Sequence, residues 1–214
     1  MKAIFISDTH NDHARLTIAP CDVLIHCGDA CTKGNFSEGQ AFLYWFVKQK
    51  AKYKLVIPGN HDFKMKTHPE LIQLAYDLGI IVLNNDSYNL EGRKIYGVST
   101  TFKAHDYVHL EGRLPAPTIQ DRINAWKDIP NNLDLLLTHM PPYGILDTNE
   151  EGNHIGCKML LEKIKEVKPK IHMFGHVHEH AMQQAKVYDT DFYNVACKNR
   201  QYFLVYPNGF EMEI

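Results

Sequence analysis

Leu55-Val56-Ile57-Pro58-Gly59-Asn60-His61-Asp62 is the stretch of this 214-residue sequence that decides the fold. A short apolar run leads, after one proline, into an amide, an imidazole and a carboxylate. Such a run is typical of a strand that is buried on both faces. In open α/β sheets, ligands bind at the carboxyl ends of these strands. The stretch therefore predicts a buried parallel strand whose end carries chemistry.

The same pattern, an apolar run followed by polar side chains, occurs four more times. The polar blocks are Ser7-Asp8-Thr9-His10, Gly28-Asp29, Thr138-His139 and Gly175-His176-Val177-His178. Alternate residues of an extended segment project to the same side, so we expect Asp8 and His10 to aim at one point. Gly28 permits a tight turn that exposes Asp29. Five expected strand ends thus carry side chains of the kinds that bind metals.

Strands and helices alternate between these blocks, which predicts right-handed parallel units. Strands are expected at 2–6, 22–27, 54–57 and 80–83, and helices at 38–50, with Ser37 as N-cap, and at 69–78. Turn residues at Glu91-Gly92 predict a hairpin of strands 87–90 and 94–99 that opens a second, more antiparallel sheet. The remaining elements are helices 119–128 and 157–167, strands 133–137 and 170–174, and antiparallel strands 181–185, 192–196 and 202–206 that close this sheet.

The composition is that of an ordinary globular protein, with 44% hydrophobic and 22% charged residues. We expect one domain over residues 1–214. The net charge of −2, without a basic cluster, disfavours long nucleic acids as partners. No signal peptide and no long apolar run is evident, so a cytoplasmic protein without membrane contact is expected. The five cysteines are expected to be free thiols, and Cys27 and Cys31 to be small buried residues rather than redox or metal groups.

In this order, the five polar blocks resemble the signature of the calcineurin-like metallophosphoesterases, from Asp8 to His178. The resemblance implies an α/β fold, a four-layer α-β-β-α sandwich of two mixed β-sheets flanked by helices. It also implies a dimetal site at the carboxyl ends of the strands. Imidazole, carboxylate and amide donors without thiolate favour two divalent transition-metal ions, Mn, Fe or Zn.

The resemblance also implies a role for each residue. The first metal would be held by Asp8, His10 and His178, and the second by Asn60, His139 and His176, with Asp29 as the bridge. The nucleophile would be a hydroxide that bridges the metals. Asn60 and His61 would contact the phosphate, and His61 would protonate the leaving oxygen as general acid. Asp62 would accept a hydrogen bond from His61 and orient its ring, or else act as the N-cap of a following helix.

Within the family, Thr138-His139-Met140-Pro141-Pro142-Tyr143-Gly144 and Gly156-Cys157 are similar to the small metallophosphoesterase-domain proteins known from brain. Those proteins act on phosphodiesters, including cyclic nucleotides. The expected function is therefore hydrolysis of a small-molecule phosphodiester. A phosphomonoesterase, including one for phosphoproteins, would use the same metals, and a non-catalytic interaction module could retain the fold. The native metals, the substrate and the oligomeric state stay open.

Several other residues match no block of the signature. We expect most of these histidines to be structural or exposed: His13, His26, His68, His105, His109, His154, His172 and His180. Asn11 and Asp12 follow the first block directly and are expected to support its ligands. The irregular segment 102–118 is expected to shape a substrate pocket.

Overall fold

Two β-sheets form the centre of the molecule, in a computed structural model that describes residues 1–99 and 119–214. The first sheet has the strand order β11-β1-β2-β3-β4. In it β1 to β4 run parallel, and β11 lies antiparallel beside β1. Its strands are β1 (Lys2–Ile6), β2 (Cys21–His26), β3 (Ala51–Val56), β4 (Ile81–Val82) and β11 (Phe210–Glu213).

The second sheet has the order β5-β6-β7-β8-β10-β9. Its four central strands are parallel, and an antiparallel strand closes each edge. The strands are β5 (Asp86–Leu90), β6 (Arg93–Val98), β7 (Leu135–Thr138), β8 (Ile171–Phe174), β9 (Gln184–Val187) and β10 (Thr190–Asn194). Both sheets are therefore mixed, as expected.

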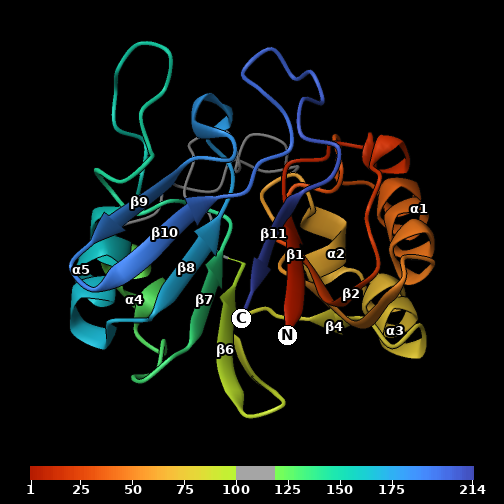
Figure 1. Cartoon of the computed structure of the whole chain (residues 1–214), viewed down its shortest axis with the longest axis horizontal. Helices are drawn as coiled ribbons and strands as arrows, with labels where there is room; N and C mark the ends of the chain where they lie inside the picture. The colour runs from red at the N-terminus through yellow and green to blue at the C-terminus, as the bar shows by residue number, and fades with distance from the viewer. Residues whose placement is uncertain (100–118) are drawn as a thin grey trace.

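Helices cover the outer face of each sheet, so the molecule has four layers (Figure 1). The first sheet is covered by α1 (Phe36–Val47), α2 (Phe63–Thr67) and α3 (Pro69–Asp77), and the second by α4 (Ile119–Trp126) and α5 (Lys158–Val167). One apolar core lies between the sheets, where Phe5 and Ile25 belong to the same cluster as Leu137 and Met173. Two further cores join each sheet to its helices. The predicted four-layer sandwich is confirmed.

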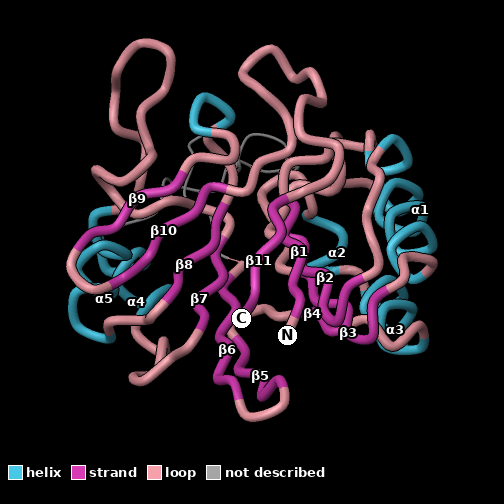
Figure 2. Tube along the Cα trace, viewed as in Figure 1, coloured by secondary structure: helices cyan, strands magenta, loops and turns pink. Residues whose placement is uncertain are grey.

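The parallel strands of both sheets end at the same edge of the molecule, where the long loops gather (upper edge in Figure 2). All five predicted polar blocks follow these ends: after β1, β2 and β3 in the first sheet, and after β7 and β8 in the second. Residues that are far apart in the chain are therefore neighbours at this edge.

Two predictions about the elements are wrong. Helix α1 begins at Phe36, and its N-cap is Asn35, whose side chain accepts the backbone N–H of Glu38. Ser37 lies in the first turn and donates its hydroxyl to Asn35 at 2.8 Å. The segment 202–206 is a loop with one isolated bridge, Lys198 to Leu204, and the last strand is β11, which joins the first sheet. Strand β10 runs parallel to β8, so its end also reaches the edge that carries the site.

Within the described residues, no helix is long and apolar enough to cross a bilayer. The segment expected to shape a substrate pocket, 102–118, lies outside the described residues, together with His105 and His109.

Candidate metal centre

Left-handed backbone turns bring the predicted side chains together at the strand ends. Asp8, His10, Asp29 and His176 have φ angles of 56°, 41°, 58° and 71°. The expectation that Asp8 and His10 converge by alternating along a strand is therefore wrong, since both residues lie in the turn after β1. Non-glycine residues in this region are uncommon, and such strain clusters at functional sites. The turn is held against the next strand end, because the Asp8 N–H donates to Gly28 at 2.9 Å and the His10 N–H to Asp29 at 3.0 Å.

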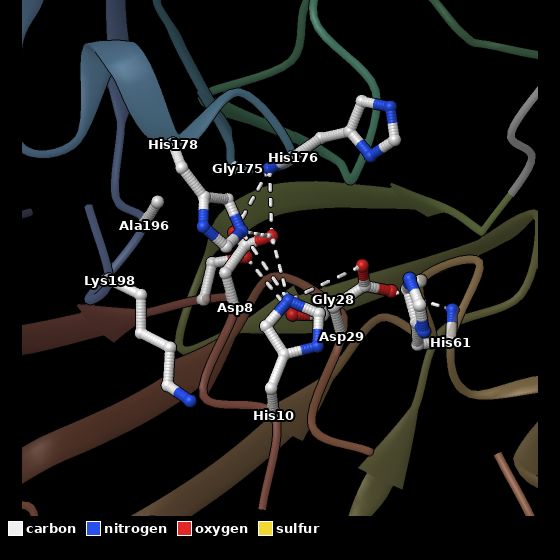
Figure 3. A network of polar contacts seen from close by, with 12 residues as sticks. Asp8, His10, Gly28, Asp29, His61, Gly175, His176, His178, Ala196 and Lys198 are labelled. Atoms are coloured by element: carbon white, nitrogen blue, oxygen red, sulfur yellow. Dashed lines mark hydrogen bonds and ion pairs between the residues drawn. The ribbon is translucent and has the colours of Figure 1, made fainter. Parts of the chain in front are cut away.

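One group of donors comprises Asp8, His10 and His178 (Figure 3). The Nε2 atoms of His10 and His178 lie 3.4 Å apart, and the His178 Nε2 lies 3.3 Å from the Asp8 Oδ1. A second group comprises Asp29, His139 and His176, with 3.1 Å between the His139 Nε2 and the Asp29 Oδ2. The His176 Nδ1 lies 3.1 Å from the same His139 nitrogen. Asp29 also belongs to a third group, with His10 and His61, so its carboxylate lies between the first two.

Three of these histidines are oriented by backbone carbonyls. The Nδ1 atoms of His10, His139 and His178 lie 3.1, 2.9 and 3.1 Å from the carbonyl oxygens of Cys31, Cys27 and Asn199. A carbonyl only accepts, so each Nδ1 carries the hydrogen, and in the neutral ring each Nε2 presents a lone pair to the centre. Ligating histidines in proteins are usually fixed in this way.

The lone pairs at the centre face one another and two carboxylates at these short distances. Such an arrangement is repulsive unless positive charge lies among the donors. The Oδ1 of Asn60, beside the third strand end, is also buried without a hydrogen-bond partner among the described residues. Imidazole, carboxylate and amide donors suit divalent transition metals. The residues present therefore fit divalent metal ions.

Without metal, protons supply this positive charge, and the pKa values shift accordingly. Burial opposes protonation of His139, but Asp29 and Asp8 outweigh it and raise its pKa to about 9. Burial also opposes the charged form of His178, and the hydrogen bond to Asp8 nevertheless raises its pKa. Burial lowers the pKa of His10. Burial would raise the pKa of the two carboxyl groups, but the histidines, His139 foremost, hold both below the ordinary value. Both aspartates are thus kept as carboxylates.

His61 approaches the site from the turn before α2. Its ring lies edge-on to that of His10, with 5.0 Å between the centroids. The backbone N–H of His61 donates to the Asp29 Oδ1 at 2.8 Å. The His61 Nδ1 lies 2.6 Å from the Thr32 carbonyl oxygen, so its hydrogen also points away from the centre. The Nε2 atom is then the one left for a substrate or an ion.

Asp62 is the N-cap residue of α2 by position, but its side chain neither caps that helix nor orients the His61 ring. Its buried carboxylate accepts the backbone N–H groups of Ala30, Cys31 and Gly59 at 3.2, 2.9 and 2.9 Å. Among the described residues, no hydrogen bond joins Asp62 to the His61 ring, and Asp62 makes no side-chain cap to α2. The carboxylate instead ties the loop after β2 to the loop after β3.

Two glycines allow the strand ends to approach closely. A Cβ atom on Gly28, which has φ of 101°, would lie 2.4 Å from the His139 Nδ1. A Cβ atom on Gly175 would lie 2.2 Å from the Asp8 Oδ2. Real Cβ atoms essentially never come this close to another heavy atom. Any other residue at these positions would displace a donor.

Two cysteines and two histidines outside the donor groups are buried in the core. Burial raises the pKa of both Cys27 and Cys31, so their thiols stay protonated. His26 and His172 are buried and contact Thr9 and Thr138. Of the two expected supporting residues, Asp12 pairs with Lys198 at 2.7 Å, whereas Asn11 is exposed.

The sequence prediction missed the loop 195–209, which follows β10 at the same edge. Lys198 is buried there, and the ring of Tyr202 lies 5.2 Å from that of His10 and 4.6 Å from that of His178. Polar residues after the expected strand 192–196 were the available signal, because they repeat the pattern of the other five blocks.

Known proteins are similar to this chain in sequence. A sequence profile of the family described as calcineurin-like phosphoesterase matches residues 1–180. A UPF0046 protein of Caenorhabditis elegans is 34% identical over 192 residues, which are 84% of this chain and 64% of that protein. Another from the same species is 33% identical over 201 residues, 84% and 69% of the two chains. Metallophosphoesterase domain-containing protein 1 of Homo sapiens is 30% identical over 200 residues, 82% and 60% of the two.

The chain thus spans less than two thirds of the length of the human relative and of the first nematode relative. Solved structures share the fold. The phosphopantetheinyl hydrolase of Mycobacterium tuberculosis has a TM-score of 0.62 at 15% identity, covering 94% of this chain and 90% of that one. The protein TT1561 of Thermus thermophilus has a TM-score of 0.61 at 15% identity, covering 92% and 89%. At this identity the similarity shows the fold alone. With its profile match and its relatives, this chain belongs to the calcineurin-like phosphoesterase family.

Proposed function

We propose that the protein hydrolyses small-molecule phosphodiesters with the help of two divalent transition-metal ions, Mn, Fe or Zn. The observation that carries the proposal is the facing lone pairs of His10, His139 and His178, each fixed by a carbonyl and aimed at two buried carboxylates. Two donor groups, linked by a third group that joins His10 of the first to Asp29 of the second, support a pair of ions rather than one. Asp8, His10 and His178 would hold one ion, Asn60, His139 and His176 the other, and Asp29 would touch both.

When bound, such ions act as Lewis acids that activate water and neutralise charge on the phosphoryl oxygens. The residues of the chain hold the ions and orient the substrate. Buried and preorganised carboxylates hold the ions in place, and the strained turns fix the positions of Asp8 and Asp29. Asn60 and His61 lie next to each other at the third strand end and would orient the phosphate.

His61 is suited to protonate the leaving oxygen. Its Nδ1 hydrogen is taken by the Thr32 carbonyl, so the imidazolium form carries its second hydrogen on Nε2, which is free to donate. General acid catalysis of this kind contributes about 10²- to 10⁴-fold. In this proposal the orientation of the ring comes from Thr32 and not from Asp62.

The charge of the described residues supports a diester rather than a monoester. A monoester carries up to two negative charges and a diester one, so the monoester profits more from additional fixed cations. Lys198 is buried next to Asn199, whose carbonyl orients His178, but its ammonium is already paired with Asp12 at 2.7 Å. A phosphomonoesterase, including a phosphoprotein phosphatase, is the second candidate, because it would use the same donors. A non-catalytic interaction module is the third.

All five cysteines are free thiols, which supports a reducing compartment such as the cytoplasm.

The test compares hydrolysis of bis(p-nitrophenyl) phosphate with that of p-nitrophenyl phosphate. Chelated protein is resupplied with Mn²⁺, and Asp29→Ala serves as the inactive variant. Asp134→Asn is the matched control, since Asp134 is a carboxylate that pairs with Lys170 at the opposite end of the strands. We expect metal-dependent cleavage of the diester well above that of the monoester.

Each other result selects a different function. Preferential cleavage of the monoester would replace the diesterase by a phosphatase. Two bound metals without turnover of either substrate, or of a panel that includes cyclic nucleotides, would favour the interaction module. Equal loss in Asp29→Ala and Asp134→Asn would show that the variants lose activity for a reason other than the donors.

A further inference from the structure

Tyr202 lies over the first donor group and is more than half exposed. Its ring is tilted by 50° to that of His178 and by 52° to that of His10, with centroids 4.6 and 5.2 Å away. The relative exposure of Tyr202 is 55%, so part of the ring is open to solvent directly beside the donors. His10 is in ring contact with both Tyr202 and His61. A phosphoester bound at the donors would therefore place one of its ester groups within reach of this ring.

The loop that presents Tyr202 is held firmly. The Asn199 side chain accepts the N–H groups of Gln201 and Phe203 at 3.1 and 3.0 Å, and the Tyr202 N–H donates to the Asn199 carbonyl at 2.8 Å. That same carbonyl accepts the His178 Nδ1 hydrogen. The buried Lys198 anchors the loop to Asp12. The position of Tyr202 is thus coupled to that of a donor histidine.

Tyr202 also carries backbone strain. Its φ angle is 62°, in the left-handed region that a bulky aromatic residue rarely adopts. Strain of this kind persists only where the surroundings enforce it, and it is often part of a functional site. The ring is held over the donors although a residue such as asparagine would fit this backbone better.

We propose that Tyr202 determines substrate specificity by stacking on a flat aromatic ring in an ester group of the bound phosphoester. The proposal rests on the proposed function, because the donors must hold the phosphoryl group. An aromatic ester carries its ring on the ester oxygen or close to it, beside the Tyr202 face. An aliphatic ester of similar charge has no flat face to offer. The substrate class is thus an aryl or other aromatic phosphodiester.

The test measures binding rather than turnover. Phenylphosphonate and methylphosphonate carry the same headgroup on a P–C bond that phosphoester hydrolysis does not cleave, and they differ in a phenyl group in place of a methyl group. Their affinities for the Mn²⁺-loaded protein are measured by calorimetry. Stacking on an aromatic side chain is worth about five- to 150-fold in affinity. We expect phenylphosphonate to bind more tightly than methylphosphonate by a factor in this range.

Three variants identify the ring responsible. Tyr202→Asn removes the ring and relieves the left-handed strain, so it should fold at least as well as the parent and lose the preference. Tyr202→Phe should keep it. Tyr188→Asn is the matched control, because Tyr188 is 57% exposed with φ of 54° in the turn between β9 and β10. It should also keep the preference.

The outcomes separate this inference from the function on which it rests. Equal affinities for the two phosphonates in the parent, or a preference that survives in Tyr202→Asn, would overturn the role of Tyr202 alone. If neither phosphonate binds the metal-loaded protein, the donors do not hold a phosphoryl group beside Tyr202 and the inference is overturned, whereas the proposed function is overturned only if bis(p-nitrophenyl) phosphate is also not cleaved. A preference lost in Tyr202→Asn and Tyr188→Asn alike would also overturn the inference.

Discussion

His61 stands one residue after the amide of Asn60, and its contacts leave one nitrogen available. Replacing it with alanine in His61→Ala removes the proposed acid while leaving every donor of the two main groups in place. We expect unchanged metal content, a small loss with p-nitrophenyl esters and a loss of about 10²- to 10⁴-fold with alkyl diesters. The measurement is kcat/KM over a series of diesters that differ in the pKa of the leaving alcohol, with metal content determined in parallel.

The dependence on the leaving group is the decisive readout. If kcat/KM depends on the pKa of the leaving alcohol with the same slope in His61→Ala and in the parent protein, a proton-donating role of His61 is refuted. Loss of one metal in His61→Ala would instead make His61 a ligand, consistent with its place in the group with His10 and Asp29.

For Asp62 we expect a result opposite to that for His61, because its carboxylate binds the backbone of two loops and not the His61 ring. In Asp62→Asn one oxygen can no longer accept, although the three N–H groups of Ala30, Cys31 and Gly59 remain buried. Hydrogen bonds to a charged group are worth about 1.5–3 kcal/mol, so we expect a lower melting temperature and weaker metal binding. The slope with leaving-group pKa should equal that of the parent. A slope like that of His61→Ala would restore the orienting role expected from the sequence.

Because His172 is buried, we expect the free energy of unfolding to decrease at acid pH. Burial lowers its pKa to about 3, and its Nε2 lies 2.8 Å from the Thr138 hydroxyl. The unfolded chain binds a proton near pH 6.5 and the folded chain does not, so the free energy of unfolding falls as the pH decreases from 6.5 toward 3. The loss reaches about 2 kcal/mol at pH 5. Urea unfolding of metal-free parent and His172→Gln at pH 7 and pH 5 measures it. The variant should lose less, and identical losses would contradict the assignment.

At this scale, the sequence predicts which residues meet but not how they are held. The residue types and their order identify the donors, because each block follows an apolar run. The turn after β1 could not be foreseen, since the left-handed conformations of Asp8 and His10 depend on backbone hydrogen bonds to the loop after β2. The partners of Asp62 belong to the same contact between loops and are equally invisible in the local sequence.

At the scale of the elements, the metal site requires that the strand ends lie close to one another as well as carry donor side chains. In Gly175→Ala the added Cβ would meet the Asp8 Oδ2 and the Ser7 hydroxyl, both at 2.2 Å. We expect loss of metal binding with the secondary structure retained, as measured by metal content and circular dichroism. Gly39→Ala is the control, because the nearest atoms to its Cβ in α1 belong to the side chains of Leu71 and Met65, with none closer than 2.9 Å. Full metal content in Gly175→Ala would show that the strand ends are looser than described.

Most elements could be predicted, because buried parallel strands and amphipathic helices leave clear patterns. Strand β1 and helix α3 agree with the expected ranges to within a residue. The end of the chain could not be assigned in the same way. The segment 202–206 has the aromatic and β-branched residues of a strand, but it makes a single bridge, and β11 pairs with β1 instead. Pairing between distant segments decides such cases, and composition does not record it.

On the scale of the whole molecule, the donors come from both sheets. Asp8 and Asp29 follow strands of the first sheet, and His139, His176 and His178 follow strands of the second. Bound metals would therefore hold the sheets together. At a metal concentration of 100 times Kd, binding to the folded state stabilises it by about 2.7 kcal/mol. We expect Mn²⁺ to raise the melting temperature of chelated protein, as measured by calorimetry. Asp29→Ala should show no such rise, and an equal rise in the variant would place the binding elsewhere.

The division of the donors between two sheets also governs when the site comes into existence during synthesis. A ribosome releases Asp8 and Asp29 long before His176 and His178, so the growing chain carries the two carboxylates without the imidazoles that complete the groups. Contacts across so much intervening sequence close late in folding. Capture of an ion would therefore be restricted to chains that have been made past residue 178 and have docked both sheets. A prematurely released fragment would keep its aspartates, yet it would compete poorly for scarce metal in the cell.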